Sequence, residues 1–210
     1  MSLATDRDLL VFEPNLFRDI AWLSQRLVKA TASISGTTLT ISAYDVDLAG
    51  AGIGPGHVVV VDGAPFEIIE RLTATTATVS RLRDDPEGSP ITPTPMSSKP
   101  ATIHTFAPQL GMVRDQVLRL VGLEPADESR VTNPDALKRL VALGALHLAY
   151  TAASAAGGEQ GWSGKAWTRG QLYLQRFSDE RQRAEAQIDL DGDGIADTRR
   201  RPNVGQLVRD

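Results

Sequence analysis

A run of aspartates near the end of the chain has the residue types and spacing of a metal-binding loop. Residues 189–197 read Asp-Leu-Asp-Gly-Asp-Gly-Ile-Ala-Asp. The oxygen donors fall at positions 1, 3, 5, 7 and 9 of a calcium loop of the EF-hand type, and Gly194 stands at position 6. The donors are the side chains of Asp189, Asp191, Asp193 and Asp197 and the backbone carbonyl of Ile195. This spacing predicts a Ca²⁺ site, and the ion would be structural because no base or nucleophile accompanies it.

Two departures from that pattern leave a second interpretation open. Position 12 is Arg200, where the calcium loop has a bidentate glutamate, and no helical pattern follows. Acidic loops of the thrombospondin and dockerin kinds resemble this one and complete the site with other ligands. The alternative is a cluster of Asx turns that ends a helix and redirects the chain. Carboxylates placed after a helix C-terminus oppose the helix dipole, and a cation would relieve that repulsion.

No other group of residues has the spacing of a catalytic site. His57, His104 and His147 are far apart in the sequence and are interpreted as core or interface residues. Neither a Gly-x-Ser-x-Gly elbow nor a phosphate-binding Gly-Lys-Ser/Thr loop occurs. We therefore expect a protein that is not an enzyme.

Composition narrows the classes of partner. The 210 residues are 41% hydrophobic and 23% charged, as in globular proteins, and the net charge of -4 argues against a protein that grips nucleic-acid phosphates. The chain has no cysteine, which excludes disulfides and thiolate metal sites. No signal peptide and no membrane-spanning run are expected, because apolar runs are short.

The acidic loop must be positioned by the helical half of the chain. A helix is predicted over 163–188 with one apolar stripe, made of Trp167, Leu174, Phe177, Ala184 and Ile188. Further helices are predicted after Pro108 and after Asn133. The second of these has two apolar sides, so it lies centrally in a bundle or is shared with another subunit. Its second stripe, a candidate subunit interface, is Leu143, Leu146 and Tyr150.

The first half of the chain is richer in Thr, Val, Ile, Gly and Pro. Residues 31–107 are predicted to form five or six short antiparallel strands in a small barrel, packed rather than ligand-binding. Asp84–Pro100 holds six prolines and glycines and is predicted to be a loop outside the sheet. Residues 1–30 are expected to be extended with a short helix over Leu16–Leu23, packing with the bundle. The predicted fold class is α+β: a helical bundle of three to four helices over 108–188, an inserted β-barrel, and an acidic loop and extended arm over 189–210.

Several of these features, taken in order, resemble a known family. They are the run Trp167–Phe177, the charged segment Asp179–Glu185, the aspartate loop and the basic tail, preceded by the Asn-Pro-Asp-Ala-Leu helix start. This order is similar to that of the head–tail connector (adaptor) proteins of tailed bacteriophages, over roughly residues 108–210. The barrel departs from the smallest adaptors, which are all helix.

The resemblance implies a virion structural protein made in the host cytoplasm and placed in the neck. Copies would form a ring, usually dodecameric, between the portal protein and a stopper or tail-completion protein. The candidate ring-forming surfaces would be the second stripe of the helix after Asn133 and the charged face of the long helix over 163–188. DNA would pass through the ring without sequence-specific binding, and the barrel would decorate the neck or contact capsid or tail. The arm that reaches the portal would be Thr198–Asp210, with contacts from Arg199, Arg200, Arg201, Val204, Leu207 and Val208. A calcium-dependent interaction module is the alternative function.

Overall fold

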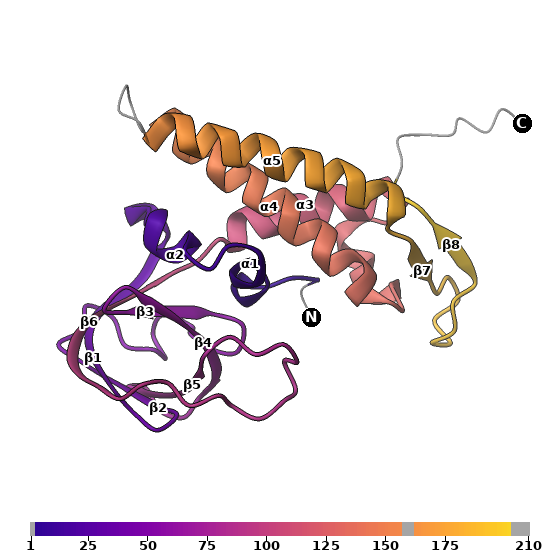
Figure 1. The fold of residues 1–210 in the computed structure, drawn as a ribbon. Helices are drawn as coiled ribbons and strands as arrows, with labels where there is room; N and C mark the ends of the chain where they lie inside the picture. Colours follow the sequence, from indigo (N-terminus) through magenta and orange to yellow (C-terminus); the bar gives the residue numbers. More distant parts are fainter. Residues whose placement is uncertain (1–2, 157–161, 203–210) are drawn as a thin grey trace, which may run out of the picture. The chain divides into compact units, whose positions relative to one another are not determined.

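The computed structural model describes residues 3–156 and 162–202. It contains two compact units, which we call the barrel unit and the helical unit (Figure 1). The barrel unit comprises Asp6–Phe106, and the helical unit comprises residues 3–5 and the chain from Ala107 onward. The α+β class and the barrel predicted from the sequence are confirmed. Within the described ranges, no helix has the length and hydropathy that crossing a membrane requires.

The barrel is a closed sheet of six antiparallel strands in the order β1-β2-β5-β4-β3-β6. The strands are β1 (Arg26–Ser35), β2 (Thr38–Ser42), β3 (Val58–Val61), β4 (Ala64–Arg71), β5 (Thr76–Ser80) and β6 (Met96–His104). A two-residue turn sets the register of β3 against β4. Asp62 and Gly63 both have positive φ, which suits the two-residue hairpin between β3 and β4.

Apolar side chains fill the barrel unit. Alternate residues of β1 and β2 are buried, which is the period expected when one face of each strand points inward. The buried cluster includes Val28, Ile34, Leu39, Ile41, Val59, Val61, Phe66, Ile68, Val79 and Ile103. This packing agrees with the interpretation of the barrel as a structural element.

The predicted loop Asp84–Pro100 is wrong at its end, because β6 already begins at Met96. Pro100 pairs with Thr31 of β1, one residue before the pairing of β6 with β3 begins at Ala101. At that position β6 has a neighbouring strand on one side only, where a missing N–H is tolerated. The Pro100 carbonyl still accepts a hydrogen bond from the amide of Asp62 at 2.9 Å.

The N-terminal segment differs in part from its prediction. α1 (Asp6–Phe12) stands where an extended start was predicted, whereas α2 (Leu16–Asp19) begins where the short helix was predicted and is followed by a 3-10 turn, η1 (Leu23–Gln25). From Asp6 onward the segment belongs to the barrel unit rather than to the bundle. Phe17 and Trp22 both pack edge-on against Phe106, the last residue of that unit, with ring centroids 5.2 and 5.8 Å away.

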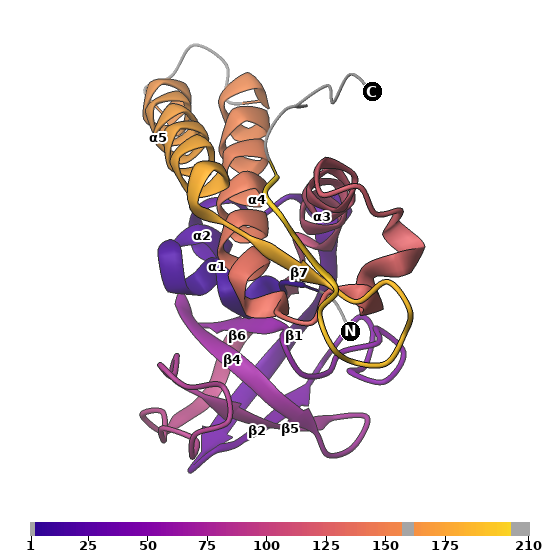
Figure 2. The same ribbon diagram turned by 90° about the vertical axis from the view of Figure 1, so that its right-hand side faces the viewer.

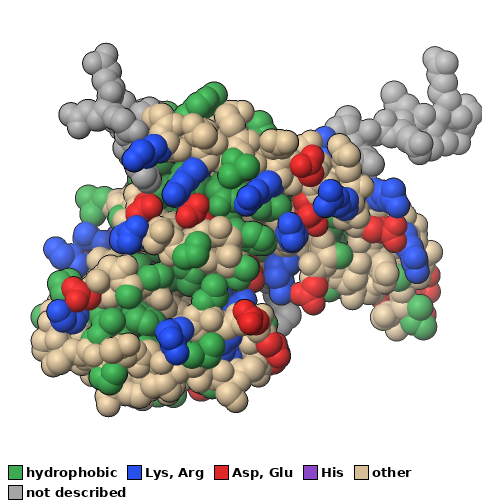
Figure 3. All heavy atoms as spheres, viewed as in Figure 1, with side chains coloured by type: hydrophobic (Ala, Val, Ile, Leu, Met, Phe, Trp, Pro, Cys, Tyr) green, Lys and Arg blue, Asp and Glu red, His purple; other side chains and the backbone are tan. Residues whose placement is uncertain are grey.

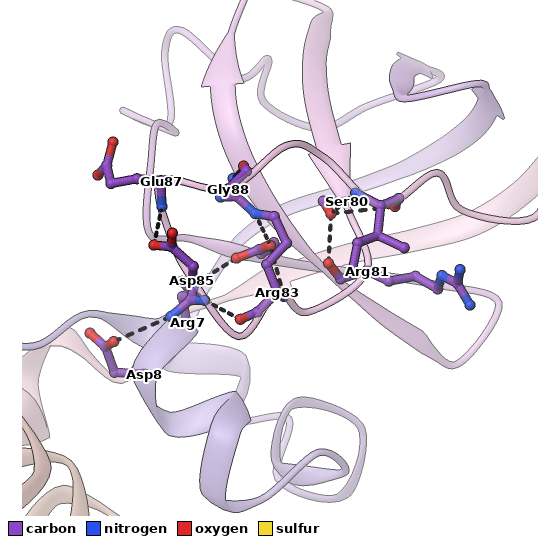
Figure 4. Close-up of polar contacts among 10 residues, drawn as sticks. Arg7, Asp8, Ser80, Arg81, Arg83, Asp85, Glu87 and Gly88 are labelled. Carbon is purple, nitrogen blue, oxygen red and sulfur yellow. Dashed lines mark hydrogen bonds and ion pairs between the residues drawn. The ribbon is translucent and has the colours of Figure 1, made fainter.

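A buried ionic network joins α1 to the barrel (Figure 4). Glu67 of β4 is 1% exposed, and its two carboxylate oxygens lie 2.6 Å from Nε of Arg7 and 2.6 Å from Nε of Arg83. Arg7 also donates a hydrogen bond to the Arg83 carbonyl. Arg7 comes from α1 and Arg83 from the loop after β5. Because both pair with Glu67, this one carboxylate fixes the helix and the loop to strand β4.

The helical unit is built around one central helix. Its helices are α3 (Ala107–Leu120), α4 (Pro134–Ala156) and α5 (Trp162–Arg183), with a 3-10 segment, η2 (Pro125–Arg130), before α4. α4 packs against both α3 and α5, as the two views show (Figures 1 and 2). A Cβ on Gly144 of α4 would lie 2.6 Å from Val113 of α3 and 3.0 Å from Phe177 of α5, so glycine lets the three helices meet closely.

The segment after α5 is a β-hairpin, where helix was predicted to Ile188. α5 ends at Arg183, and β7 (Ala186–Ile188) pairs with β8 (Thr198–Arg200). The hairpin is anchored by the segment before α4. The side chain of Asn133 binds the Glu185 carbonyl and the Gln187 amide, at 2.9 and 2.7 Å, and the Asp189 amide donates to the Arg130 carbonyl at 2.9 Å. The acidic loop is therefore the turn of this hairpin.

Candidate metal centre and assembly surfaces

The four aspartates of the loop accept hydrogen bonds from the loop's own backbone. Asp189 is buried and binds the amides of Gly192 and Gly194, at 2.6 and 2.7 Å. Asp197 binds the Leu190 amide at 2.6 Å, and Asp191 and Asp193 each accept from the amide two residues ahead. The amides of Gly194 and Gly192 hold the pKa of Asp189 below its usual value. The Asx-turn interpretation thus describes how the loop is built.

Three of the predicted metal ligands also converge. One carboxylate oxygen from each of Asp189, Asp191 and Asp197 lies within 4.8 Å of the others. Asp193 is outside this group, and Ile195 is 69% exposed. Three carboxylate oxygens at this separation fit a hard cation such as Ca²⁺ if carbonyl or water oxygens complete the shell.

The predicted portal-binding arm begins with residues bound to their own unit. Arg200 donates from Nη1 to the carbonyls of Val121 and Gly122, at 3.1 and 3.3 Å, and so satisfies the C-terminal end of α3. Arg199 and Arg201 approach Glu185 at 3.7 and 3.8 Å, with exposed side chains. Val204, Leu207 and Val208 lie outside the described residues. Thr198–Arg200 is therefore strand β8 of the hairpin rather than the start of an extended arm, and the portal contact stays a prediction.

The predicted subunit interface on α4 is wrong. Leu143, Leu146 and Tyr150 are at most 1% exposed and lie in the core of the helical unit. Tyr150 stacks on Tyr173 of α5 with ring centroids 5.8 Å apart, and its hydroxyl binds Arg169 at 2.9 Å. Of the two interpretations of the two-sided helix, the central position in a bundle is the correct one.

The predicted apolar stripe of α5 is displaced by part of a turn. Trp167 and Leu174 are exposed, and Ile188 belongs to a strand. The buried face is Ala166, Gly170, Tyr173, Phe177 and Ala184, the last just beyond the helix end. Gly170 allows the close approach to α4, because a Cβ there would lie 3.1 Å from the Thr151 hydroxyl. The small residues at 166 and 170 mark this face in the sequence, and bulk alone does not find it.

Part of the charged face of α5, the candidate ring-forming surface of the long helix, is a basic surface. Its residues recur at helical spacing and form what we call the basic stripe: Lys165, Arg169, Leu172, Arg176 and Arg183. Leu172 is 43% exposed in the middle of the stripe. Lys and Arg side chains are spaced along α5 in the space-filling view (Figure 3).

The histidines take structural places. His147 of α4 is hydrogen-bonded to the Gly170 carbonyl of α5 at 2.9 Å, and His57 binds the Gly54 carbonyl at 3.0 Å. His104 is buried at the end of β6, where burial lowers its pKa, and its Nδ1 has no hydrogen-bond partner among the described residues.

Comparisons of the chain with family models, with curated proteins and with solved structures gave no match.

Proposed function

We propose that the chain is a structural component of a tailed-phage neck, forming a ring between the portal and the tail or head-completion proteins. Copies would surround a passage through which DNA moves without sequence-specific binding. The proposal includes no catalytic role. It rests on the resemblance over roughly residues 108–210 and on the surface of α5.

The observation that carries the proposal is the set of large apolar side chains exposed on α5. Trp167 is 53% exposed, and Leu174, seven residues further on and so on the same helix face, is also exposed. Leu172 is exposed on a different side of the helix. Large apolar side chains exposed on a helix indicate surfaces that another protein covers. The filled interior of the barrel supports a structural part rather than a ligand-binding module.

The experiment mixes the purified chain with portal rings encoded in the same genome and images them by electron cryo-microscopy. A ring of added density on the portal is expected, and unchanged portal rings would argue strongly against the proposal. The arm is tested with Arg199→Glu and Arg201→Glu together, because both side chains are exposed. Weaker docking is expected. Arg119→Glu on α3, also exposed, is the matched control.

A calcium-binding interaction module is the second candidate, favoured by the convergence of Asp189, Asp191 and Asp197. Micromolar-to-millimolar affinity for Ca²⁺ is expected from a loop of this ligand set. Calorimetric titration should show binding that Asp191→Asn weakens. Asp193→Asn is the matched control, because Asp193 is outside the converging group. Absence of heat in the wild type would remove this candidate and leave the ring proposal intact.

A further inference from the structure

The basic stripe is an excess of positive charge in an acidic protein. α5 carries five Lys and Arg residues against Asp179 and Glu180, whereas the whole chain has a net charge of -4. Within the described ranges, Lys165, Arg176 and Arg183 form no ion pair with an acidic side chain. Three cations without acidic partners, with Leu172 between them, make a surface suited to an acidic segment that also has apolar groups.

The chain contains a segment of that description at the end of its β7–β8 hairpin. We call it the hairpin tip: Leu190, Asp191, Asp193 and Ile195, all exposed. Asp191 and Asp193 each use Oδ1 for a loop hydrogen bond, and within the described ranges neither forms an ion pair. Acidic and apolar side chains are visible together at the end of the hairpin (Figure 3).

The hairpin tip does not contact the basic stripe of its own copy. Hydrogen bonds from residues 130–133 fix β7 beside the segment before α4. The tip therefore extends beyond the C-terminal end of α5 in both views (Figures 1 and 2). The stripe runs back toward the helix start, with Leu172 about 16 Å from Arg183 at a rise of 1.5 Å per residue. The two complementary surfaces can meet only between different copies.

We infer that the hairpin tip of one copy docks on the basic stripe of α5 in a neighbouring copy. Leu190 and Ile195 cover Leu172, and Asp191 and Asp193 face Lys165, Arg169 and Arg176. The contact is heterologous, since it joins two different surfaces, and repeated contacts of this kind close into a ring when the rotation between copies permits. The inference rests on the proposed ring and assigns the surfaces that join its copies.

The experiment uses the absence of cysteine from the chain. Leu172→Cys and Ile195→Cys are purified separately, one with a mass tag, mixed, and treated with a short bis-maleimide. The control mixture pairs Ile195→Cys with Met112→Cys, which places an exposed thiol on α3 instead. We expect a heterodimer from the first mixture at several times the yield of the control. A yield no higher than that of the control would overturn the inference.

A charge exchange tests the ionic part of the contact. Arg176→Glu added to the Leu172→Cys variant should lower the heterodimer yield, and Asp193→Arg in the other copy should restore it. No loss with Arg176→Glu would contradict the assigned orientation. DNA is the competing occupant of a basic stripe. If a short DNA duplex binds the wild type, this binding is lost in Arg176→Glu, and no heterodimer is cross-linked, the inference would also be overturned. Cross-linking is measured in the absence of portal rings, so the two proposals can fail separately. A cross-link without portal binding would refute only the proposed function. Portal binding without a cross-link would refute only this inference.

Discussion

Replacement of Glu67 by alanine should destabilise the barrel unit strongly. Glu67 lies 2.6 Å from Nε of both Arg7 and Arg83, and it is 1% exposed. Its removal leaves two largely buried guanidinium groups without their shared counter-charge. Breaking a buried pair in this way costs about 3–5 kcal/mol of unfolding free energy. For a unit of about 100 residues unfolding cooperatively, that corresponds to a melting temperature lower by about 15–25 °C.

Thermal and urea unfolding of the full chain, followed by circular dichroism, measure this effect. The matched control is Glu70→Ala, an exposed carboxylate on the same strand, for which a change within about 0.5 kcal/mol is expected. If Glu67→Ala unfolds with the same midpoint as Glu70→Ala, the network contributes nothing to stability. The account of how α1 is attached to the barrel would then be wrong.

Three further predictions concern burial, close packing and a helix end. Burial raises the pKa of Asp6 to about 6, so the contribution of this group to stability is present below its unfolded pKa, near 4, and is lost as pH rises through about 6. The melting temperature of Asp6→Asn, compared with that of the wild type, should therefore increase as pH rises from 4 to 7. A difference that does not depend on pH would refute this. Gly144→Ala should cost about 1–3 kcal/mol because its Cβ would collide with Val113 and Phe177, whereas Gly111→Ala, with open space around it, should stabilise α3 by up to about 1 kcal/mol; urea unfolding distinguishes the two, and equal effects would contradict the packing. Arg200→Ala should cost about 1 kcal/mol by freeing the Val121 and Gly122 carbonyls, and Arg199→Ala should be near neutral; equal melting temperatures for the two variants would show that the α3 end does not need Arg200.

Residue patterns predicted the secondary structure where they fitted only the helical period or only the strand period. Where a segment fitted both periods, the pattern did not decide between helix and strand. Ala184 and Ile188 are four apart, which fits one face of a helix, but with Ala186 they also alternate as in a strand. The buried, half-buried, buried pattern of β7 shows that the second period holds. What decides between the periods is the pairing with β8 and the bonds from Asn133, which are tertiary contacts that local spacing does not contain.

The two-sided α4 and the strand through Pro100 illustrate the same limit. The apolar pattern of α4 predicted that two of its faces are buried. It did not show whether the second face packs against α5 of the same copy or against another subunit. Pro100 excluded a central strand position, but only the closed barrel shows that β6 has one neighbour there. In the acidic loop, position in the sequence predicted the ligand types, while the hairpin turn decides that Asp193 lies outside the converging group.

The most direct test of the central claim is the mass of the complex formed with portal rings from the same genome, measured by native mass spectrometry. The account predicts one added copy of the chain for each portal subunit, with loss of the added copies when Arg176→Glu disrupts contacts between them. Portal rings that keep their own mass, or that gain a single copy, would contradict it.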